Sequence, residues 1–384
     1  MRTKIAYCIP SLYYPSGMER VVTLKANYLA DILNYDITII LTDGKDKKPY
    51  YELSPSIKII NLDINYDELY GKSLIKKISS YFCKQYLFKK KLNSTLHKIK
   101  PDITISTLRR EINFINSIQD GSLKVGEIHF SKANYRDFKN EKILSIFQKI
   151  IAHFWMSKLI KELKKIDTFV VLSHEDKLKW RELENITVIH NPLSFFSEKT
   201  SDCNAKQVIA VGRYVPQKGF DILINAWNIV SQKHPEWILR IYGDGMRKEL
   251  EEQIYSLRIS NSCFLEHSVS NIADKYCESS IFVLSSRYEG FGMVITEAMA
   301  CGVPAVSFAC PCGPKDIIKN GIDGLLVENG NIQELADKIC YLIEHEDVRK
   351  EMGKQARINV ERFKIENIAM KWKELFDSLL DSKK

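Results

Sequence analysis

The chain has 384 residues, of which 45% are apolar, 10% aromatic and 27% charged, and its formal net charge is +8. This length predicts two domains of ordinary size, and the mixed composition excludes disordered, collagen-like and low-complexity proteins. The nine cysteines contain no CxxC pair, so we expect reduced thiols in a cytoplasmic protein rather than disulfides or a zinc site. No stretch reaches the ~18 apolar residues that predict a membrane span.

Short apolar and β-branched runs alternate with longer amphipathic segments along the first half of the chain. Strands that alternate with helices in this way indicate βαβ units and a parallel sheet. The first half therefore predicts one doubly wound α/β unit over 1–191. Its expected strands are 3–10, 36–42, 57–62, 102–106, 123–128, 167–172 and 186–190, and its expected helices are 19–34, 64–100 in pieces, 140–164 and 174–183.

Asn191-Pro192 interrupts this alternation, and residues 194–205 are expected to form a linker. The pattern then resumes and predicts a second Rossmann-like unit over 206–365. Ligands bind at the carboxyl ends of the strands in such sheets, so we expect the two units to face a central cleft that holds the functional site. The expected strands of this half are 207–212, 237–242, 262–266, 281–285, 303–307 and 324–327, and the chain from about 331 is expected to be almost entirely helical.

The segment 72–100 contains nine lysines and no Asp or Glu, and apolar residues lie between the lysines. A basic helix with an apolar side favours binding to an anionic membrane surface. The alternative is a solvated surface helix whose lysines only aid solubility. Nucleic-acid binding is not expected, because no zinc-finger, homeodomain or aromatic RNA-binding motif accompanies the charge.

Two strand-to-helix turns have features of an anion site. After the first strand, Gly17 stands near a helix start, where backbone amides can approach an anion; a plain turn glycine is the alternative. After strand 207–212, Arg213 and Lys218 flank another helix start. Cations there oppose the helix dipole, so a phosphate ligand explains them better than helix stability does.

A third turn follows strand 281–285 and carries two carboxylates. Glu289 lies just before a helix expected to begin near Gly292 or Met293, and Glu297 lies more than one turn inside that helix. Both carboxylates can then face one crevice, with backbone amides between them. Carboxylates accept hydrogen bonds from sugar hydroxyls, and amides at a helix start stabilise phosphate charge. In the alternative interpretation, Glu289 is only a helix N-terminal acid and Glu297 faces solvent.

A fourth turn ends the expected strand 123–128 and contains Glu127 and His129. Side chains two residues apart on an extended strand point the same way. A histidine there can donate a hydrogen bond or carry a proton near neutral pH. A structural histidine is the alternative.

With these residues, the chain resembles glycosyltransferase family 4, a group of retaining, sugar-nucleotide-dependent enzymes with the α/β GT-B fold. The matching motifs cover about 210–330, and the first half matches through its Gly17 turn, Glu127 and His129 and its strand order. The motifs are Gly212-Arg213, Lys218-Gly219, the E-x7-E signature from Glu289 to Glu297, Ala298-Met-Ala-Cys-Gly302-Val-Pro304 and Gly321-Ile-Asp-Gly324-Leu-Leu-Val327.

The resemblance implies a role for each of these residues. Arg213 and Lys218 would hold the donor diphosphate, and Glu297 would bind the ribose hydroxyls. His129 or Glu127 would act on the acceptor side; Ile128 separates them, where many relatives have an adjacent Glu-His pair. The helix 366–384 would cross back onto the first, acceptor-binding domain. The implied catalytic residues are His129, Glu127 and Glu289, and the implied donor-binding residues are Gly17, Arg213, Lys218, Glu289, Gly290, Phe291, Gly292, Met293, Val294 and Glu297.

The implied activity is transfer of a hexose, with retention, from a UDP- or GDP-sugar to a hydroxyl of a growing, lipid-linked cell-surface glycan. The sequence contains no DxD triplet, so we expect no metal and no cofactor, the nucleotide sugar being a substrate. Such an enzyme would lie in the cytoplasm, peripherally on the inner face of the cell membrane. The alternatives are a transferase for a soluble acceptor and a non-catalytic module that binds nucleotide sugars.

Overall fold

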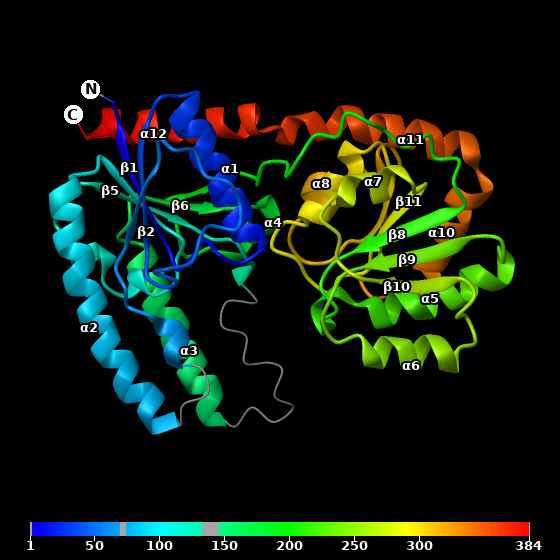
Figure 1. The fold of residues 1–384 in the computed structure, drawn as a ribbon, viewed down its shortest axis with the longest axis horizontal. Coiled ribbons are helices and arrows are strands. Elements are labelled where there is room, and N and C mark those ends of the chain that lie inside the picture. The colour runs from blue at the N-terminus through cyan, green and yellow to red at the C-terminus, as the bar shows by residue number, and fades with distance from the viewer. Residues whose placement is uncertain (1, 70–73, 133–145, 384) are drawn as a thin grey trace. The chain divides into compact units, whose positions relative to one another are not determined.

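The computed structural model describes residues 2–69, 74–132 and 146–383. The start of the expected helix 140–164 and the first two residues of the basic segment 72–100 lie outside these ranges. The chain divides into two compact units (Figure 1). Unit 1 comprises Met1–Leu172, Lys177–Pro192 and Ile365–Lys384, and unit 2 comprises Ser173–Asp176 and Leu193–Lys364.

Unit 1 is built on a parallel sheet with the strand order β3-β2-β1-β4-β5-β6-β7. The strand order reverses between β1 and β4, which are neighbours in the sheet although β2 and β3 separate them in the sequence. The strands are β1 (Lys4–Ile9), β2 (Asp36–Leu41), β3 (Lys58–Asn61), β4 (Ile103–Ser106), β5 (Leu123–Glu127), β6 (Thr168–Val171) and β7 (Ile186–Val188). The helices are α1 (Gly17–Asp31), α2 (Leu74–Ile99), α3 (Ile146–Leu163) and α12 (Ile365–Ser382), and α4 (His174–Lys179) begins in unit 2 and ends in unit 1.

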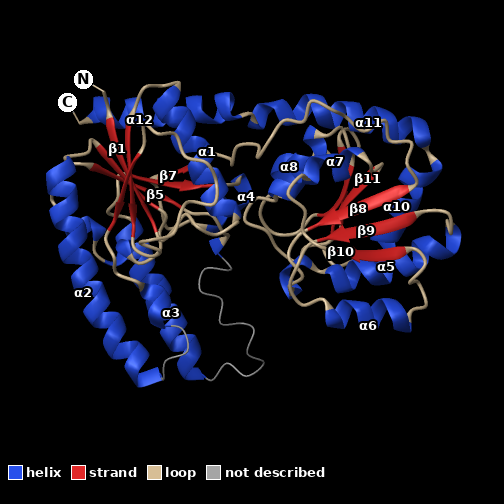
Figure 2. Ribbon diagram, viewed as in Figure 1, coloured by secondary structure: helices blue, strands red, loops and turns tan. Residues whose placement is uncertain are grey.

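Unit 2 repeats this architecture with the strand order β10-β9-β8-β11-β12-β13, so the order reverses between β8 and β11. In each unit the strands occupy the centre and helices lie outside them (Figure 2). The strands are β8 (Gln207–Val211), β9 (Ile238–Tyr242), β10 (Cys263–Glu266), β11 (Ile281–Leu284), β12 (Ala305–Phe308) and β13 (Gly324–Val327). The helices are α5 (Phe220–Lys233), α6 (Lys248–Ser256), α7 (Ile272–Cys277), α8 (Met293–Ala300), α9 (Pro314–Ile317), α10 (Ile332–Glu344) and α11 (Glu346–Asn359).

The central strands are buried on both faces, as sheets covered by helices require. Every residue of β4, β11 and β12 is buried, including the polar residues of β4, and β11 is a continuous apolar run rather than an alternating one. The strands therefore need helices on either side, and the amphipathic segments between them supply those helices. The predicted α/β class with two parallel, doubly wound sheets is confirmed.

The basic helix α2 buries its apolar side in unit 1. Phe88, Leu92 and Leu96 are fully buried and pack in one core cluster with Ala6 and Cys8 of β1. These side chains recur every three or four residues, the spacing that places them on one helix face. The apolar side expected to meet a membrane is thus partly a core face. Phe82 and Tyr86 remain outside it, 67% and 73% exposed.

Two segments that the sequence placed outside the second domain, whose expected start is residue 206, belong to unit 2. Ser173–Asp176 belongs to unit 2, where the Glu175 carboxylate accepts a hydrogen bond of 2.9 Å from the Cys312 amide. Unit 2 resumes at Leu193, so the expected linker 194–205 forms part of it. Among the described residues, no helix is both long enough and apolar enough to cross a membrane.

Candidate functional site

The carboxyl edge of the unit 2 sheet brings two of the expected turns together. Because β8 and β11 are parallel neighbours, the loops that follow them leave the same edge of the sheet, at the point where the strand order reverses. This is the position where doubly wound sheets bind ligands. The loop after β8 carries Arg213 and Lys218, and the loop after β11 carries Glu289.

Lys218 and Glu289 connect these two loops directly. The Lys218 ammonium lies 2.7 Å from Glu289 Oε1, and both side chains are mostly buried. The Ser286 hydroxyl donates to the same carboxylate oxygen over 2.6 Å. Glu289 is therefore held in place from both loops, and its other oxygen, Oε2, remains as an acceptor for a ligand hydroxyl. Lys218 is partly neutralised, so its charge alone cannot balance a diphosphate.

Arg213 supplies the charge that Lys218 lacks. Arg213 is exposed, and its guanidinium forms no hydrogen bond or ion pair with another described residue. An exposed guanidinium at the carboxyl edge of a sheet can bind a phosphate through two parallel hydrogen bonds. The charge of Arg213 is therefore available to an anionic ligand at this edge of the sheet.

Close backbone packing explains the glycine between Lys218 and helix α5. Gly219 has φ +62°, and a Cβ atom there would lie 2.1 Å from the carbonyl oxygen of Ser285. Only glycine permits both the left-handed backbone and this approach of the two loops. Gly219 of the motif is thus required by the loop geometry.

Helix α8 begins at Met293, as the sequence predicted, and presents its N-terminus at this edge. Its N-cap, Gly292, has φ +97° and offers no side chain to the first amides of the helix. Those amides and the helix dipole can stabilise an anion. Gly290 and Phe291 lie in the turn before the helix, and Val294 lies in its first turn.

Glu297 lies in the second turn of α8 and is 5% exposed. The hydroxyl of Tyr276, from α7, donates to Glu297 Oε2 over 3.3 Å, and Tyr276 itself is fully buried. The structure therefore excludes the alternative in which Glu297 faces solvent. Its carboxylate is oriented by a side chain of a neighbouring helix.

In unit 1, Glu127 ends β5 and lies at the corresponding carboxyl edge. Both of its oxygens are 2.5 Å from the ammonium of Lys25, and neither residue is more than 1% exposed. The Lys25 ammonium also lies 3.9 Å from the centre of the Trp372 ring, on α12. Glu127 is thus the acid of a buried ion pair that joins β5, α1 and the C-terminal helix.

His129 follows Glu127 closely in space. Its Nε2 lies 3.5 Å from Glu127 Oε1, and its side chain is 5% exposed. Burial lowers the pKa of His129 to about 4, although the Glu127 carboxylate opposes this shift. The imidazole is therefore neutral at physiological pH and can donate one hydrogen bond while accepting another.

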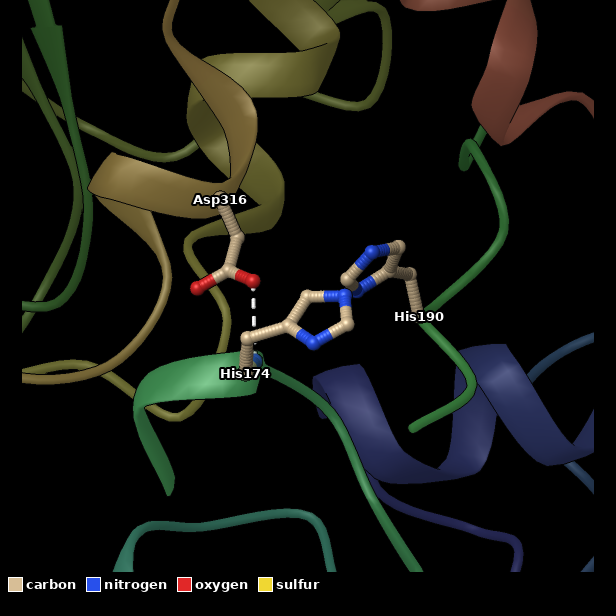
Figure 3. A group of neighbouring side chains, drawn as sticks. All are labelled: His174, His190 and Asp316. Carbon is tan, nitrogen blue, oxygen red and sulfur yellow. Dashed lines mark hydrogen bonds between the residues drawn. The ribbon is translucent and has the colours of Figure 1, made fainter. Parts of the chain in front are cut away.

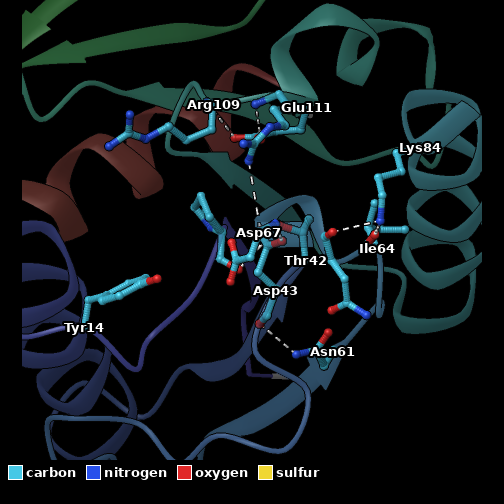
Figure 4. A network of polar contacts seen from close by, with 12 residues as sticks. Tyr14, Thr42, Asp43, Asn61, Ile64, Asp67, Lys84, Arg109 and Glu111 are labelled. Carbon is cyan, nitrogen blue, oxygen red and sulfur yellow. Dashed lines mark hydrogen bonds and ion pairs between the residues drawn. The ribbon is translucent and has the colours of Figure 1, made fainter. Parts of the chain in front are cut away.

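The other loops at the carboxyl edge of unit 1 form a polar network (Figure 4). The Asp67 amide donates to Asp43 Oδ1 over 3.2 Å, and the Arg110 amide donates to Glu111 Oε2 over 3.0 Å. Burial raises the pKa of Asp43. Gly17, the first residue of α1, is exposed at this same edge, after β1. Side-chain carboxylates therefore hold the backbone of these loops in place.

Asp316 serves a structural contact within unit 2. Its Oδ1 accepts a hydrogen bond of 2.8 Å from the His174 amide at the start of α4 (Figure 3). His190, drawn with these two residues, belongs to unit 1, where its Nδ1 lies 2.7 Å from the carbonyl oxygen of Leu172. Because the three residues come from different units, we do not consider them a metal site.

Sequence reasoning missed three residues that shape these sites. Lys25 carries a signal, since it stands among the apolar positions of α1, where a solvated lysine is not expected. Ser286 lies three residues before Glu289, in a turn already singled out. Tyr276 carries no local signal, because only the packing of α7 against α8 brings it to Glu297.

Unit 2 resembles a known protein family, and the whole chain resembles known proteins. Residues 194–359, all within unit 2, match the family model described as Glycosyl transferases group 1. An uncharacterized glycosyltransferase of Haemophilus influenzae is 27% identical over 376 residues, which cover 96% of this chain and 99% of that protein. A Campylobacter jejuni protein is 27% identical over 382 residues and is covered to 98%, with 97% of this chain aligned. Its name describes an alpha-1,4-N-acetyl-D-galactosaminyltransferase acting on a GalNAc-containing diNAcBac-PP-undecaprenol.

The crystal structure of a TarM mutant from S. aureus, in complex with Fondaparinux, alpha-GlcNAc-glycerol and UDP, matches the chain with a TM-score of 0.75. The match covers 97% of this chain and 99% of that one at 18% identity. The fold is GT-B. The GT-B fold, the family match and the relatives aligned over nearly the whole chain together support the assignment of this chain as a glycosyltransferase.

Proposed function

We propose that the chain is a retaining glycosyltransferase that moves a hexose from a UDP- or GDP-sugar to a hydroxyl of a growing, lipid-linked cell-surface glycan. The observation that carries this proposal is the junction of Lys218 and Glu289 beside the exposed Arg213 and the N-terminus of α8. The presence of UDP in the TarM complex and the acceptor named for the Campylobacter relative support it.

The donor would bind to unit 2 through cationic and amide groups at its diphosphate and through carboxylates at its sugar hydroxyls. Arg213 and the α8 amides would hold the diphosphate, and Lys218 would lie between the diphosphate and Glu289. Glu289 would accept a hydrogen bond from the transferred sugar, and Glu297 from the ribose hydroxyls. The cationic groups and helix dipole would stabilise the negative charge that develops on the leaving diphosphate.

The acceptor would bind to unit 1, near His129. In the proposed front-face reaction, the bond between the anomeric carbon and the phosphate oxygen breaks, and a bond from the acceptor oxygen to that carbon forms on the same face. The leaving phosphate takes the proton of the acceptor hydroxyl. Neutral His129 would donate a hydrogen bond to a substrate hydroxyl at the carboxyl edge of unit 1, and Lys25 would hold Glu127 in position beside it.

The cationic side chains would replace a divalent metal in this mechanism, and no cofactor would take part. We also propose that the outward face of α2 binds an anionic bilayer. Phe82 and Tyr86 are one helical turn apart and exposed there, and Lys89 and Lys90 are exposed in the following turn. Aromatic rings next to lysines suit the interface of an anionic membrane.

A donor screen tests the transferase. We expect one UDP- or GDP-sugar to raise the melting temperature and, with a lipid-linked glycan acceptor, to release its nucleoside diphosphate. The Arg213→Ala variant should lower kcat by about ten- to a thousandfold. The variant Lys48→Gln, at an exposed lysine of unit 1, is the matched control. Unchanged turnover in Arg213→Ala would contradict the donor assignment, and binding of every donor without transfer would favour a non-catalytic module.

A vesicle assay tests the membrane face separately. The double variant Phe82→Ser/Tyr86→Ser should bind phosphatidylglycerol vesicles at least about fivefold more weakly than the native chain. The pair Tyr50→Ser/Tyr255→Ser, which removes two other exposed aromatic rings, is the control. Equal vesicle binding by the native chain and the Phe82/Tyr86 variant would refute docking through this face.

A further inference from the structure

A cavity of about 410 Å³ lies at the opposite edge of the unit 1 sheet from His129. Its floor is formed where three parallel strands begin, at Lys4 of β1, Asp36 of β2 and Lys58 of β3. The last two turns of α2 form the facing wall, where Lys98 is the cationic residue. The cavity lies at the edge where the strands begin, whereas His129 lies at the carboxyl edge. It shares no residue with the sites described above.

The lining of this cavity is strongly cationic. It contains three lysines and one carboxylate. Lys58 uses its charge in an ion pair of 3.1 Å with Asp36 Oδ1. Within residues 2–69, 74–132 and 146–383, no carboxylate forms an ion pair with the ammonium group of Lys4 or Lys98. Two cationic groups of the lining are therefore left uncompensated.

The remaining lining residues complement those charges. Ser94 and Thr95 line the wall, and the hydroxyl groups of such residues can donate to an anionic oxygen. Ile60 and Ile99 add an apolar portion. The carbonyls at the end of α2 oppose an anion with about half an elementary charge, which is smaller than the two uncompensated ammonium charges. The balance of charge favours an anion.

We propose that this cavity binds a phosphate-bearing ligand, with Lys4 and Lys98 holding the phosphate and Ile60 and Ile99 contacting the carbon portion next to it. The volume exceeds what one phosphate needs and is within the range of small-molecule sites, about 300–1,000 Å³. The shared chemistry is a phosphate ester, which can come from a phospholipid headgroup or from a soluble phosphorylated molecule. This ligand is distinct from the sugar-nucleotide donor, because the lining lies in unit 1 and the donor loops lie in unit 2.

Calorimetric titration with inorganic phosphate and with glycerol phosphate tests the site on the full chain. All titrations use the Arg213→Ala background, so that phosphate held by the donor loops does not obscure the result. The pair Lys4→Gln/Lys98→Gln should weaken phosphate binding by at least about tenfold, and glycerol phosphate should bind more tightly than phosphate. The control pair Lys48→Gln/Lys161→Gln makes the same charge change on exposed lysines of unit 1 and should change binding less than about twofold.

Equal weakening by both pairs would show only a general charge effect and would overturn the site, as would absence of saturable binding in the background chain. Far-ultraviolet circular dichroism and melting temperatures establish that each variant is folded. Because Lys4 and Lys98 are on the surface, we expect no loss of fold. A second variant, Thr95→Val, removes a hydroxyl without changing charge and should also weaken phosphate binding.

Vesicle binding then distinguishes the two sources of the phosphate. If phosphatidylglycerol vesicles bind the Lys4/Lys98 variant more weakly than the Lys48/Lys161 control, the ligand is a lipid headgroup. If vesicle binding is equal but glycerol phosphate affinity falls, the ligand is soluble. Either outcome supports the cavity. Failure of the donor assay described above would leave these results unaffected, since no donor is used.

Discussion

Acid should destabilise unit 1 through the burial of His129. The imidazole has a pKa of about 4 in the folded chain, against 6.5 for the unperturbed group, and its side chain is only 5% exposed. The unfolded chain therefore binds a proton near pH 6.5, whereas the folded chain resists it until about pH 4. The stability contributed by neutral His129 is complete above about pH 7 and is lost as the pH falls from 6.5 toward 4.

The size of the effect follows from these two pKa values. Between pH 7.5 and pH 5, proton binding to the unfolded chain should lower the free energy of unfolding by about 2 kcal/mol, and the full loss approaches about 3 kcal/mol below pH 4. Such a loss is a large share of the stability of a single domain. Other groups also titrate in this range, so the prediction concerns the difference from a variant that lacks His129.

Urea unfolding of the native chain and of His129→Gln, at several pH values between 7.5 and 5, measures this difference. The native chain should lose about 2 kcal/mol more than the variant does over that interval. The control His97→Gln removes an exposed imidazole of the same unit and should follow the native chain. If native and His129→Gln lose the same stability, His129 is not held neutral by burial and the reasoning is wrong.

Three further predictions follow from contacts at the two sites. Lys25→Met should lower the free energy of unfolding of unit 1 by about 3–5 kcal/mol in urea, because it leaves the buried Glu127 carboxylate unpaired; a loss below 1 kcal/mol would contradict this. Tyr276→Phe should weaken donor binding by about five- to tenfold in calorimetry, because Glu297 loses the hydroxyl that orients it, and unchanged affinity would remove Tyr276 from the site. Activity should be fully retained in EDTA, and a metal requirement restored by added Mg²⁺ or Mn²⁺ would contradict the cationic mechanism.

The order and type of the elements could be predicted from local sequence. The start of α8 at Met293 was predicted to within a residue of Gly292, because a glycine-rich turn after a buried strand leaves few other places for the helix to begin. The approach of Lys218 to Glu289 could be inferred less directly. The proximity of Lys218 and Glu289 depends on β8 and β11 being neighbours in the sheet, and no local sequence pattern predicts which strands pair.

The basic segment shows where a sequence pattern is ambiguous. Its lysines and apolar residues predicted a helix with an apolar side, but could not say what that side contacts. In the structure, Phe88 and Leu92 pack in the core, whereas Phe82 and Tyr86 are exposed. Both sets recur at helical spacing, so periodicity alone could not separate a core face from a surface face.

By itself, the sequence determined two alternating α/β halves, the turns rich in glycine and charged residues, and the run of lysines that contains no acid. These features depend on local propensity and spacing, which residues close together in the chain determine. Only the tertiary structure decided that Lys25 neutralises Glu127, that Tyr276 orients Glu297, and that the first residues of three strands and the last turns of α2 line one cationic cavity. Each of these joins residues far apart in the chain, and their proximity is set by strand order and helix packing.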